Sequence, residues 1–164
     1  MPSFKKVIEG VKNPFLGDVF AFDPGETTGF AHLKGDRLIR TDQLNTKTVK
    51  DTVIAIETFR DEFTSYLLGL EAGEYKGVNF AIEDYRIYSH KSDTHKWSNV
   101  HTIKVVGLLE ALAESLGCKY KLRMASEAKN FVTDDYLKDW GFWRSGERHA
   151  RDAIRHGIMQ ILFP

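Results

Sequence analysis

The spacing of apolar residues changes once along the chain, and this change constrains the fold more than any other feature of the sequence. Before residue 45, short apolar runs are separated by turns at residues 23–25 (Asp-Pro-Gly) and 34–36 (Lys-Gly-Asp). Over residues 49–70, apolar residues recur instead every three or four positions, which is typical of an amphipathic helix. The sequence therefore predicts a helix that follows an antiparallel meander of three strands. These strands are expected at 18–22, 28–33 and 37–44.

Strands and helices alternate in the rest of the chain. We expect strand 78–83, helix 97–116, strand 120–124, a short helix 126–132 that begins at a Ser126 cap, and helix 147–162. The order β-β-β-α-β-α-β-α predicts an α/β fold, a mixed five-stranded sheet with helices on both faces. Because strand–helix–strand crossovers are right-handed, the first and fourth strands are expected to be neighbours. Residues 1–17 are expected to form a leader before a single domain at 18–164.

Two acidic residues stand at the ends of these neighbouring strands. Asp23 closes the first strand and Glu83 closes the fourth, and ligands of such sheets favour the carboxyl ends of strands. Taken alone, Asp23 is typical of a turn, and Glu83 is typical of the first solvated residue after an apolar strand. Neighbouring strands lie about 4.8 Å apart, so the two carboxylates would repel each other unless a cation or a proton lay between them.

The last helix adds a third acid. On a helical wheel, small and apolar residues share the face expected to pack on the sheet, and Asp152, His149 and His156 line one edge of that face. His149 and Asp152 are three residues apart and are therefore neighbours on the helix surface. Ordinary charged flanks of a helix N-terminus are the alternative. Carboxylates with an adjacent imidazole suit Mg²⁺ or Mn²⁺, and two such ions can activate water in phosphodiester cleavage.

The charge balance excludes a histone-like polycation but not a local basic surface. Lys and Arg together number 23, as do Asp and Glu. Residues 1–85 carry 10 basic and 14 acidic side chains, whereas residues 86–164 carry 13 and 9. The single cysteine, Cys118, allows neither a disulfide framework within the chain nor a cysteine-based zinc cluster. No apolar run approaches the roughly 20 residues that span a bilayer, and the N-terminus lacks the apolar core of a signal peptide. We therefore expect an intracellular protein without a membrane segment.

Several stretches of the sequence resemble the RuvC-like Holliday junction resolvases of the RNase H-like nuclease superfamily, and most closely their bacteriophage-encoded branch. These stretches are 22–31 (FDPGETTGFA), 81–85 (AIEDY), 126–129 (SEAK) and 148–153 (RHARDA). The resemblance implies an RNase H-like fold and a location in the bacterial cytosol. It also implies a homodimer that nicks two opposed strands of a four-way DNA junction.

The resemblance further implies a set of site residues. It assigns the catalytic, metal-binding acids to Asp23, Glu83 and Asp152, with two Mg²⁺ or Mn²⁺ ions per site. His149, one helical turn before Asp152, is expected to be a metal ligand or a water-orienting base. Bacterial members often carry an aromatic residue three positions after the strand-four glutamate, where it packs against junction bases. This chain has Arg86 there, which leaves the base-stacking role and the sequence preference open.

Basic and aromatic side chains near these stretches are the candidates for DNA contact. Each basic residue taken alone is typical of a solvated surface charge, but as a set beside the proposed site they are suited to binding phosphates. The tyrosines are suited to stacking on bases, and Lys129 is singled out because the family resemblance includes it. The full set is Lys129, Arg86, Tyr85, Tyr88, Lys121, Arg123, Arg148 and Arg151.

Three other functions fit part of the pattern. An RNase H-like nuclease that cuts RNA–DNA hybrids, forks or flaps would use the same acids. An actin-like kinase or ATPase also begins with an Asp-x-Gly-Thr phosphate loop, but it needs a second similar domain, for which 164 residues are too few. A binding module without catalytic activity is the third alternative.

The helix expected at 97–116 is the predicted dimer contact. A four-way junction must be cut on two strands, and a two-fold pair of chains would supply two sites. The apolar residues of this helix cover more than one narrow stripe, which leaves apolar surface beyond what the sheet should cover. They include Val100, Ile103, Val106, Gly107 and residues 109–112. The alternative is that all of them belong to the core of one chain.

Overall fold

The computed structural model describes residues 1–71, 76–85 and 97–164. The strands are β1 (Asp18–Asp23), β2 (Thr27–Lys34), β3 (Arg37–Asn45), β4 (Val78–Asp84) and β5 (Lys119–Met124). The helices are α1 (Phe4–Glu9), α2 (Val49–Leu68), α3 (Trp97–Ser115), α4 (Ala125–Phe131), α5 (Asp134–Asp139) and α6 (Arg148–Leu162). The five strands and the helices α2, α3, α4 and α6 begin and end within two residues of their predicted bounds.

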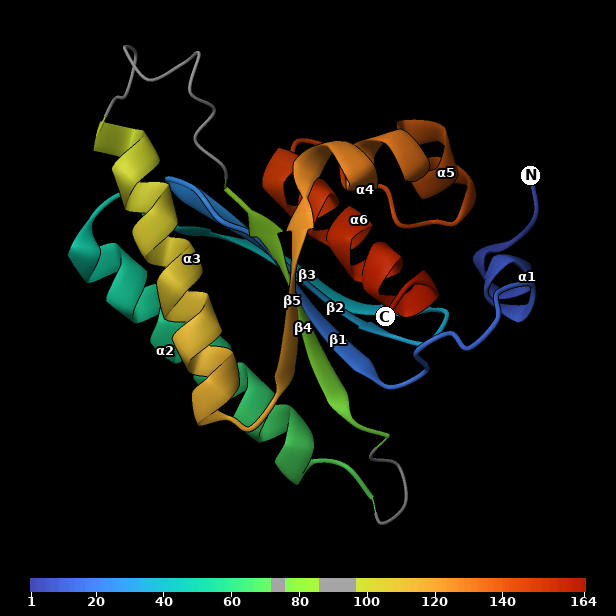
Figure 1. Cartoon of the computed structure of the whole chain (residues 1–164), viewed down its shortest axis with the longest axis horizontal. Coiled ribbons are helices and arrows are strands. Elements are labelled where there is room, and N and C mark those ends of the chain that lie inside the picture. The colour runs from blue at the N-terminus through green and yellow to red at the C-terminus, as the bar shows by residue number, and fades with distance from the viewer. Residues whose placement is uncertain (72–75, 86–96) are drawn as a thin grey trace.

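The strands form one mixed sheet in the order β3-β2-β1-β4-β5 (Figure 1). The first three strands pair antiparallel, and β4 pairs parallel with both β1 and β5. The predicted α/β fold is therefore confirmed, with the first and fourth strands as neighbours at the centre of the sheet. This arrangement brings the carboxyl ends of β1 and β4 to the same edge.

The two faces of the sheet are covered by different helices and lined by side chains of different size. α2 and α3 cover one face, and α1, α4, α5 and α6 lie on the other (Figure 1). The face toward α2 and α3 is largely aromatic, with Phe20, Phe22, Phe30, Phe80 and Ile82. The face toward α6 carries smaller residues, namely Val19, Ala21, Ala31 and Ala81. Side chains alternate between the two faces along a strand. Asp23 and Glu83 follow Phe22 and Ile82, which face α2 and α3, so the two acids lie on the face toward α6.

Short helices account for the main differences from the predicted elements. α5 was not expected; Thr133 caps it, since the Thr133 hydroxyl accepts a hydrogen bond from the N–H of Tyr136. Six residues make fewer than two turns, so α5 has no readable apolar period. The predicted Ser126 cap is wrong, because α4 begins at Ala125 and the residue at its N-cap position is Met124.

Residues 1–17, the expected leader, pack against the rest of the domain. Phe4 and Ile8 of α1 are buried in the same apolar cluster as the α6 face of the sheet. The Phe4 ring centroid lies 4.9 Å from that of Trp140, and the Trp140 indole N–H donates to the Pro2 carbonyl at 3.0 Å. Among the described residues, no helix combines the length and the apolar character that a bilayer crossing requires.

Candidate active site

Asp23 and Glu83 lie next to each other at the carboxyl ends of the two central parallel strands. Phe22 of β1 is opposite Ile82 of β4 in the register, so the next residues, Asp23 and Glu83, also lie beside each other. Phe22 and Ile82 point into the α2/α3 core, and therefore the two acids point toward α6. Asp23 is buried and Glu83 half-buried. The sheet thus brings together the two strand-end carboxylates that the sequence singles out.

A glycine allows α6 to approach this edge of the sheet. Gly29 of β2 pairs with Asp23 of β1. A Cβ atom at Gly29 would lie 2.0 Å from the carbonyl oxygen of His149 and 2.8 Å from the backbone nitrogen of Ala150. The first turn of α6 therefore rests directly on the backbone of β2, beside Asp23. This contact places His149 at the end of β1.

A side chain from the distant strand β3 caps the N-terminus of α6. The Oε1 atom of Gln43 accepts hydrogen bonds from the backbone N–H groups of His149, at 2.8 Å, and Ala150, at 3.2 Å. The N-cap residue, Glu147, makes no capping hydrogen bond with its own side chain. Gln43 therefore satisfies two N–H groups that a helix N-terminus otherwise leaves without partners. It also fixes the orientation of the first turn of α6 against the sheet.

His149 is hydrogen-bonded to the carboxylate of Asp23. The His149 Nδ1 atom lies 2.7 Å from Asp23 Oδ2. Burial raises the pKa of Asp23 to about 6; the hydrogen bond with His149 opposes this shift, and the charges of Glu83 and Asp152 add to it. The hydrogen bond to Asp23 in turn raises the pKa of His149, against the effect of burial. Because an ionised carboxylate only accepts, an N–H at Nδ1 donates to Asp23.

His156, two turns further along α6, is hydrogen-bonded to Glu83. The His156 Nε2 atom lies 2.8 Å from Glu83 Oε2, and the imidazole is fully buried. Burial by itself raises the pKa of Glu83, but the hydrogen bond and charge of His156, with a smaller contribution from Lys129, bring the net shift below the ordinary value. The two histidines at the edge of the α6 wheel therefore each hold one strand-end carboxylate.

Asp152 is buried and paired with two cationic side chains. Its Oδ1 atom accepts from Arg155 Nη1 at 2.7 Å, and its Oδ2 atom lies 3.0 Å from the Nζ atom of Lys129. Asp152 also lies close enough to Asp23 to raise the pKa of that residue. The third predicted acid therefore belongs to the same cluster, but both of its oxygens are engaged by bases.

The donor chemistry of this cluster fits a hard divalent cation. Within the described parts of the chain, no three His, Cys, Asp or Glu side chains are arranged to hold a metal ion as they stand. Each of the three carboxylates is instead paired with a basic side chain. Yet Asp23, Glu83 and Asp152 are buried or half-buried, and the charges of Glu83 and Asp152 both act on Asp23. Carboxylate oxygens are the ligands that Mg²⁺ and Mn²⁺ prefer, so these residues could hold such ions.

A surface pocket rich in basic side chains adjoins Asp152. It is lined by Lys129, Arg148, Arg151 and Arg155, together with Asp134 and Asp152. Arg148 is exposed, whereas the guanidinium of Arg151 stacks 4.3 Å from the ring centroid of Trp143. Three of the predicted DNA-binding residues, Lys129, Arg148 and Arg151, are therefore gathered in one place beside the acidic cluster.

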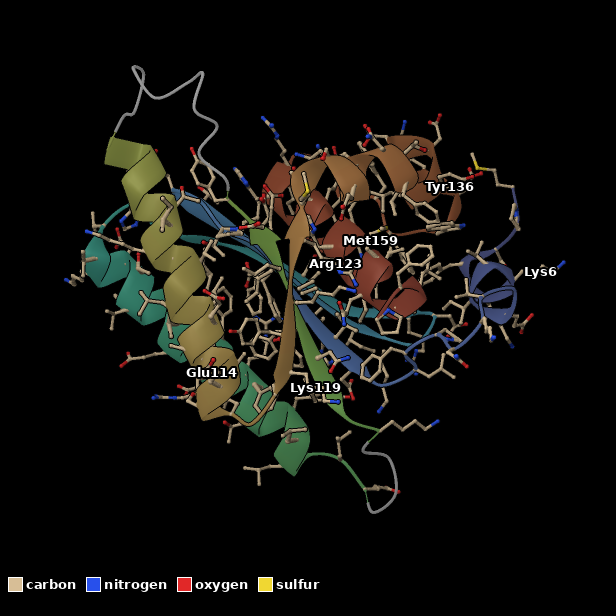
Figure 2. The ribbon with its side chains drawn as sticks, viewed as in Figure 1. Lys6, Glu114, Lys119, Arg123, Tyr136 and Met159 are labelled. Atoms are coloured by element: carbon tan, nitrogen blue, oxygen red, sulfur yellow. The ribbon has the colours of Figure 1, made fainter. Side chains whose placement is uncertain are left out.

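The other predicted DNA-binding residues lie elsewhere. Arg123 of β5, labelled in Figure 2, is buried. Its guanidinium binds Gln160 of α6 at 2.7 and 3.0 Å. The Arg123 side chain therefore has almost no exposed surface with which to make the predicted DNA contact. Lys121 is exposed on β5 and donates to the carbonyl of Phe163, near the far end of α6. Tyr85 packs in part against the α2/α3 core.

Two further predicted DNA-binding residues, Arg86 and Tyr88, lie outside the described residues. Their expected contact with DNA therefore stays a prediction from the sequence.

The sequence does not predict the partners of three residues that build this site, namely Arg155, His156 and Gln43. Arg155 follows Asp152 by three positions on the same helix, a spacing that makes two side chains neighbours. The sequence alone could therefore have indicated the Arg155–Asp152 pair. His156 was placed at the edge of the buried face, but no partner was assigned to it. Gln43 bonds to residues 106 and 107 positions away, and nothing in the local sequence indicates that pairing.

Comparison with known proteins gives a result for the fold only. No family model matches the sequence, and no curated protein does. Among solved structures, T. thermophilus RuvC in complex with Holliday junction substrate is similar, with a TM-score of 0.60, 12% sequence identity, and coverage of 87% of this chain and 90% of that chain. A PilM-PilN type IV pilus biogenesis complex aligns with a TM-score of 0.43 and 12% identity over 95% of this chain and 48% of that chain. The chain therefore has the RuvC-like form of the RNase H-like fold.

Proposed function

We propose that this protein is a divalent-metal-dependent endonuclease that resolves four-way and other branched DNA junctions. The observation that carries the proposal is the convergence of three carboxylates, from two strand ends and one helix, with His149 beside them. The similarity of the fold to a protein solved with Holliday junction substrate supports it. Asp23, Glu83 and Asp152 would hold two Mg²⁺ or Mn²⁺ ions. Bound ions of this kind activate water and stabilise the leaving oxygen of a phosphodiester.

The basic side chains of the site would orient the carboxylates. His156 is fully buried and holds Glu83 through Oε2 of that carboxylate. Arg155 holds Asp152 in the same way through Oδ1. Such outer partners fix the direction of metal-binding oxygens. His149 is half-exposed beside Asp23, and it would serve as a ligand or hold a water in position for attack.

The basic pocket beside Asp152 would hold the DNA backbone. Lys129, Arg148 and Arg151 present positive charge a short distance from the acidic cluster. Phosphate contacts of this kind position a DNA strand without reading its sequence. The pocket would therefore align a backbone phosphate with the carboxylates.

Cleavage of defined DNA structures tests this proposal directly. With Mg²⁺ or Mn²⁺, the protein is expected to nick two opposed strands of an end-labelled four-way junction, and EDTA is expected to abolish the reaction. Forks, flaps and RNA–DNA hybrids of equal length, measured in parallel, are expected to react more slowly. Faster cleavage of the hybrid would favour an RNase H-like enzyme. Tight junction binding without any cleavage would favour a binding module.

We also propose that the protein acts as a two-fold dimer with α3 at the contact. Val106, Leu109 and Leu112 are buried in the α2/α3 core, which narrows the apolar surface predicted for this helix. Ile103 and Leu108 each keep 41% of their surface exposed. Exposed apolar side chains on one helix are suited to a self-complementary interface.

Substitution of one of these residues is expected to weaken the dimer. Ile103→Glu should raise the dimer dissociation constant by about tenfold or more, because a charge would be buried at the contact. Sedimentation equilibrium at micromolar concentration, with and without junction DNA, measures the effect. Leu68→Glu, at an exposed apolar residue at the end of α2, is the matched control. A wild-type protein that is monomeric under both conditions would instead favour an enzyme that makes single cuts.

A further inference from the structure

The two oxygens of the Asp152 carboxylate are held in different ways. Oδ1 is bonded to Arg155, whose side chain is 8% exposed. The guanidinium of Arg155 also donates to the carbonyl of Val132 at 2.8 Å and is paired with Asp134. Three partners, two of them at the junction of α4 and α5 and one on α6, therefore fix Arg155, and through it Oδ1 of Asp152. Oδ1 of Asp152 is therefore held in place by a buried hydrogen bond.

The contact of the second oxygen is weaker. Oδ2 of Asp152 lies 3.0 Å from the Nζ atom of Lys129, a side chain that is 42% exposed. A lysine carries its charge on a flexible four-carbon stem, and a half-exposed side chain loses little when it moves. The charge of Lys129 also acts on Glu83. The ammonium thus stands close to two of the three acids, where it supplies the positive charge that a divalent cation would supply.

We propose that Lys129 is a displaceable plug: its ammonium occupies the Asp152 oxygen that would face a divalent cation, and a DNA phosphate draws it away. The proposal rests on the function proposed above. Lys129 lines the basic pocket as well as contacting Asp152, so the same side chain reaches both places. A phosphate in that pocket offers the ammonium another anion.

The plug makes binding of DNA and binding of metal cooperative. When a phosphate binds the ammonium of Lys129, Oδ2 of Asp152 becomes available to the cation. When a cation binds Oδ2, the ammonium of Lys129 becomes available to the phosphate. Because coupling between two binding sites is reciprocal, each ligand raises the affinity for the other by the same factor. Without DNA, the plug keeps the carboxylates neutralised and the affinity for metal low.

Metal binding in the absence of DNA tests the plug without any cleavage. Mn²⁺ is titrated into the protein, and free Mn²⁺ is followed by its electron paramagnetic resonance signal. Lys129→Met keeps the length of the side chain and removes its charge, and it is expected to bind Mn²⁺ about tenfold or more tightly than wild type, roughly the worth of one charge-assisted hydrogen bond. Lys129→Gln serves as a second variant should the methionine reduce folding, which circular dichroism monitors.

Lys138→Met is the matched control. Lys138 is an exposed lysine on α5 that lies 3.6 Å from the exposed Asp135, so the same substitution removes the same charge outside the site. Its Mn²⁺ affinity is expected to stay within about twofold of wild type, because exposed distant charges are screened. Wild-type affinity in both Lys129 variants would overturn the plug and leave the proposed function standing. If neither wild type nor variants bind Mn²⁺, the proposed metal site is overturned as well.

The DNA half of the proposal has its own measurement. Ca²⁺ binds the same kind of oxygen ligands, so junction affinity is compared in Ca²⁺ and in EDTA by fluorescence anisotropy. In wild type, Ca²⁺ should strengthen binding both by bridging to the phosphate and by releasing Lys129. In Lys129→Met only the bridging contribution remains, so the gain should be smaller. An equal gain in both proteins would show that DNA does not displace Lys129.

Discussion

Asp23→Asn is expected to lower metal-dependent cleavage of a four-way junction by about a thousandfold or more. The amide has nearly the shape of the carboxylate and can still accept the hydrogen bond from His149, but it has no charge with which to hold a cation. A bound metal ion stabilises a transition state by several kcal/mol, and about 1.4 kcal/mol corresponds to a factor of ten in rate. The initial rate on an end-labelled junction measures the loss.

Stability and DNA binding distinguish a lost metal ligand from a lost fold. Because burial raises the pKa of Asp23 to about 6, the ionised carboxylate opposes folding at pH 7. The neutral asparagine should therefore unfold at the same urea concentration as wild type or a higher one, and junction binding in EDTA should be largely kept. Asp36→Asn, in the exposed β2–β3 turn, is the control and should cleave normally. Cleavage by Asp23→Asn at the wild-type rate would remove Asp23 from the site.

Much of the fold could be predicted because the central strands are buried in a regular way. All six residues of β1 are buried, and aromatic residues alternate with smaller ones on its two faces. The right-handed crossover rule then placed β4 beside β1, as the structure confirms. α5 could not be predicted from apolar periodicity, because a six-residue helix gives too little of it. The burial of Phe4 against Trp140 depends on tertiary contact alone.

The positions of the candidate site residues at strand ends could be predicted from the sequence. The polar contacts between residues far apart in the chain could not. Asp23 and Glu83 are adjacent because the parallel register fixes them. Charge alone suggested that Arg123 binds DNA, but the sequence does not show that Gln160 would bind its guanidinium in the interior. Likewise, nothing local shows that Lys129 would lie on Asp152. Patterns in a sequence therefore place the acids, whereas the contact of Lys129 with Asp152 and that of Arg123 with Gln160 emerge only from packing.

The close approach of α6 to β2 makes Gly29→Ala the substitution with the largest expected effect on structure and activity together. Its Cβ atom would lie 2.0 Å from the carbonyl oxygen and 2.2 Å from the carbonyl carbon of His149. These are backbone atoms, which cannot turn aside as a flexible side chain can, so the first turn of α6 must move. That shift would carry His149 and Asp152 away from Asp23 and would lengthen the hydrogen bond that His149 makes.

We expect Gly29→Ala to lower the free energy of unfolding by about 2–3 kcal/mol, the usual cost of overpacking a close contact. Because a misplacement of about 1 Å at reacting groups costs roughly a hundredfold in rate, cleavage should fall at least that far in the folded fraction. Urea denaturation and single-turnover cleavage measure the two effects. Gly69→Ala is the control, since its Cβ would meet only ordinary contacts at 3.5 Å and its φ of −84° suits any residue. If Gly29→Ala were as stable and active as Gly69→Ala, the α6 contact would not be what positions the site.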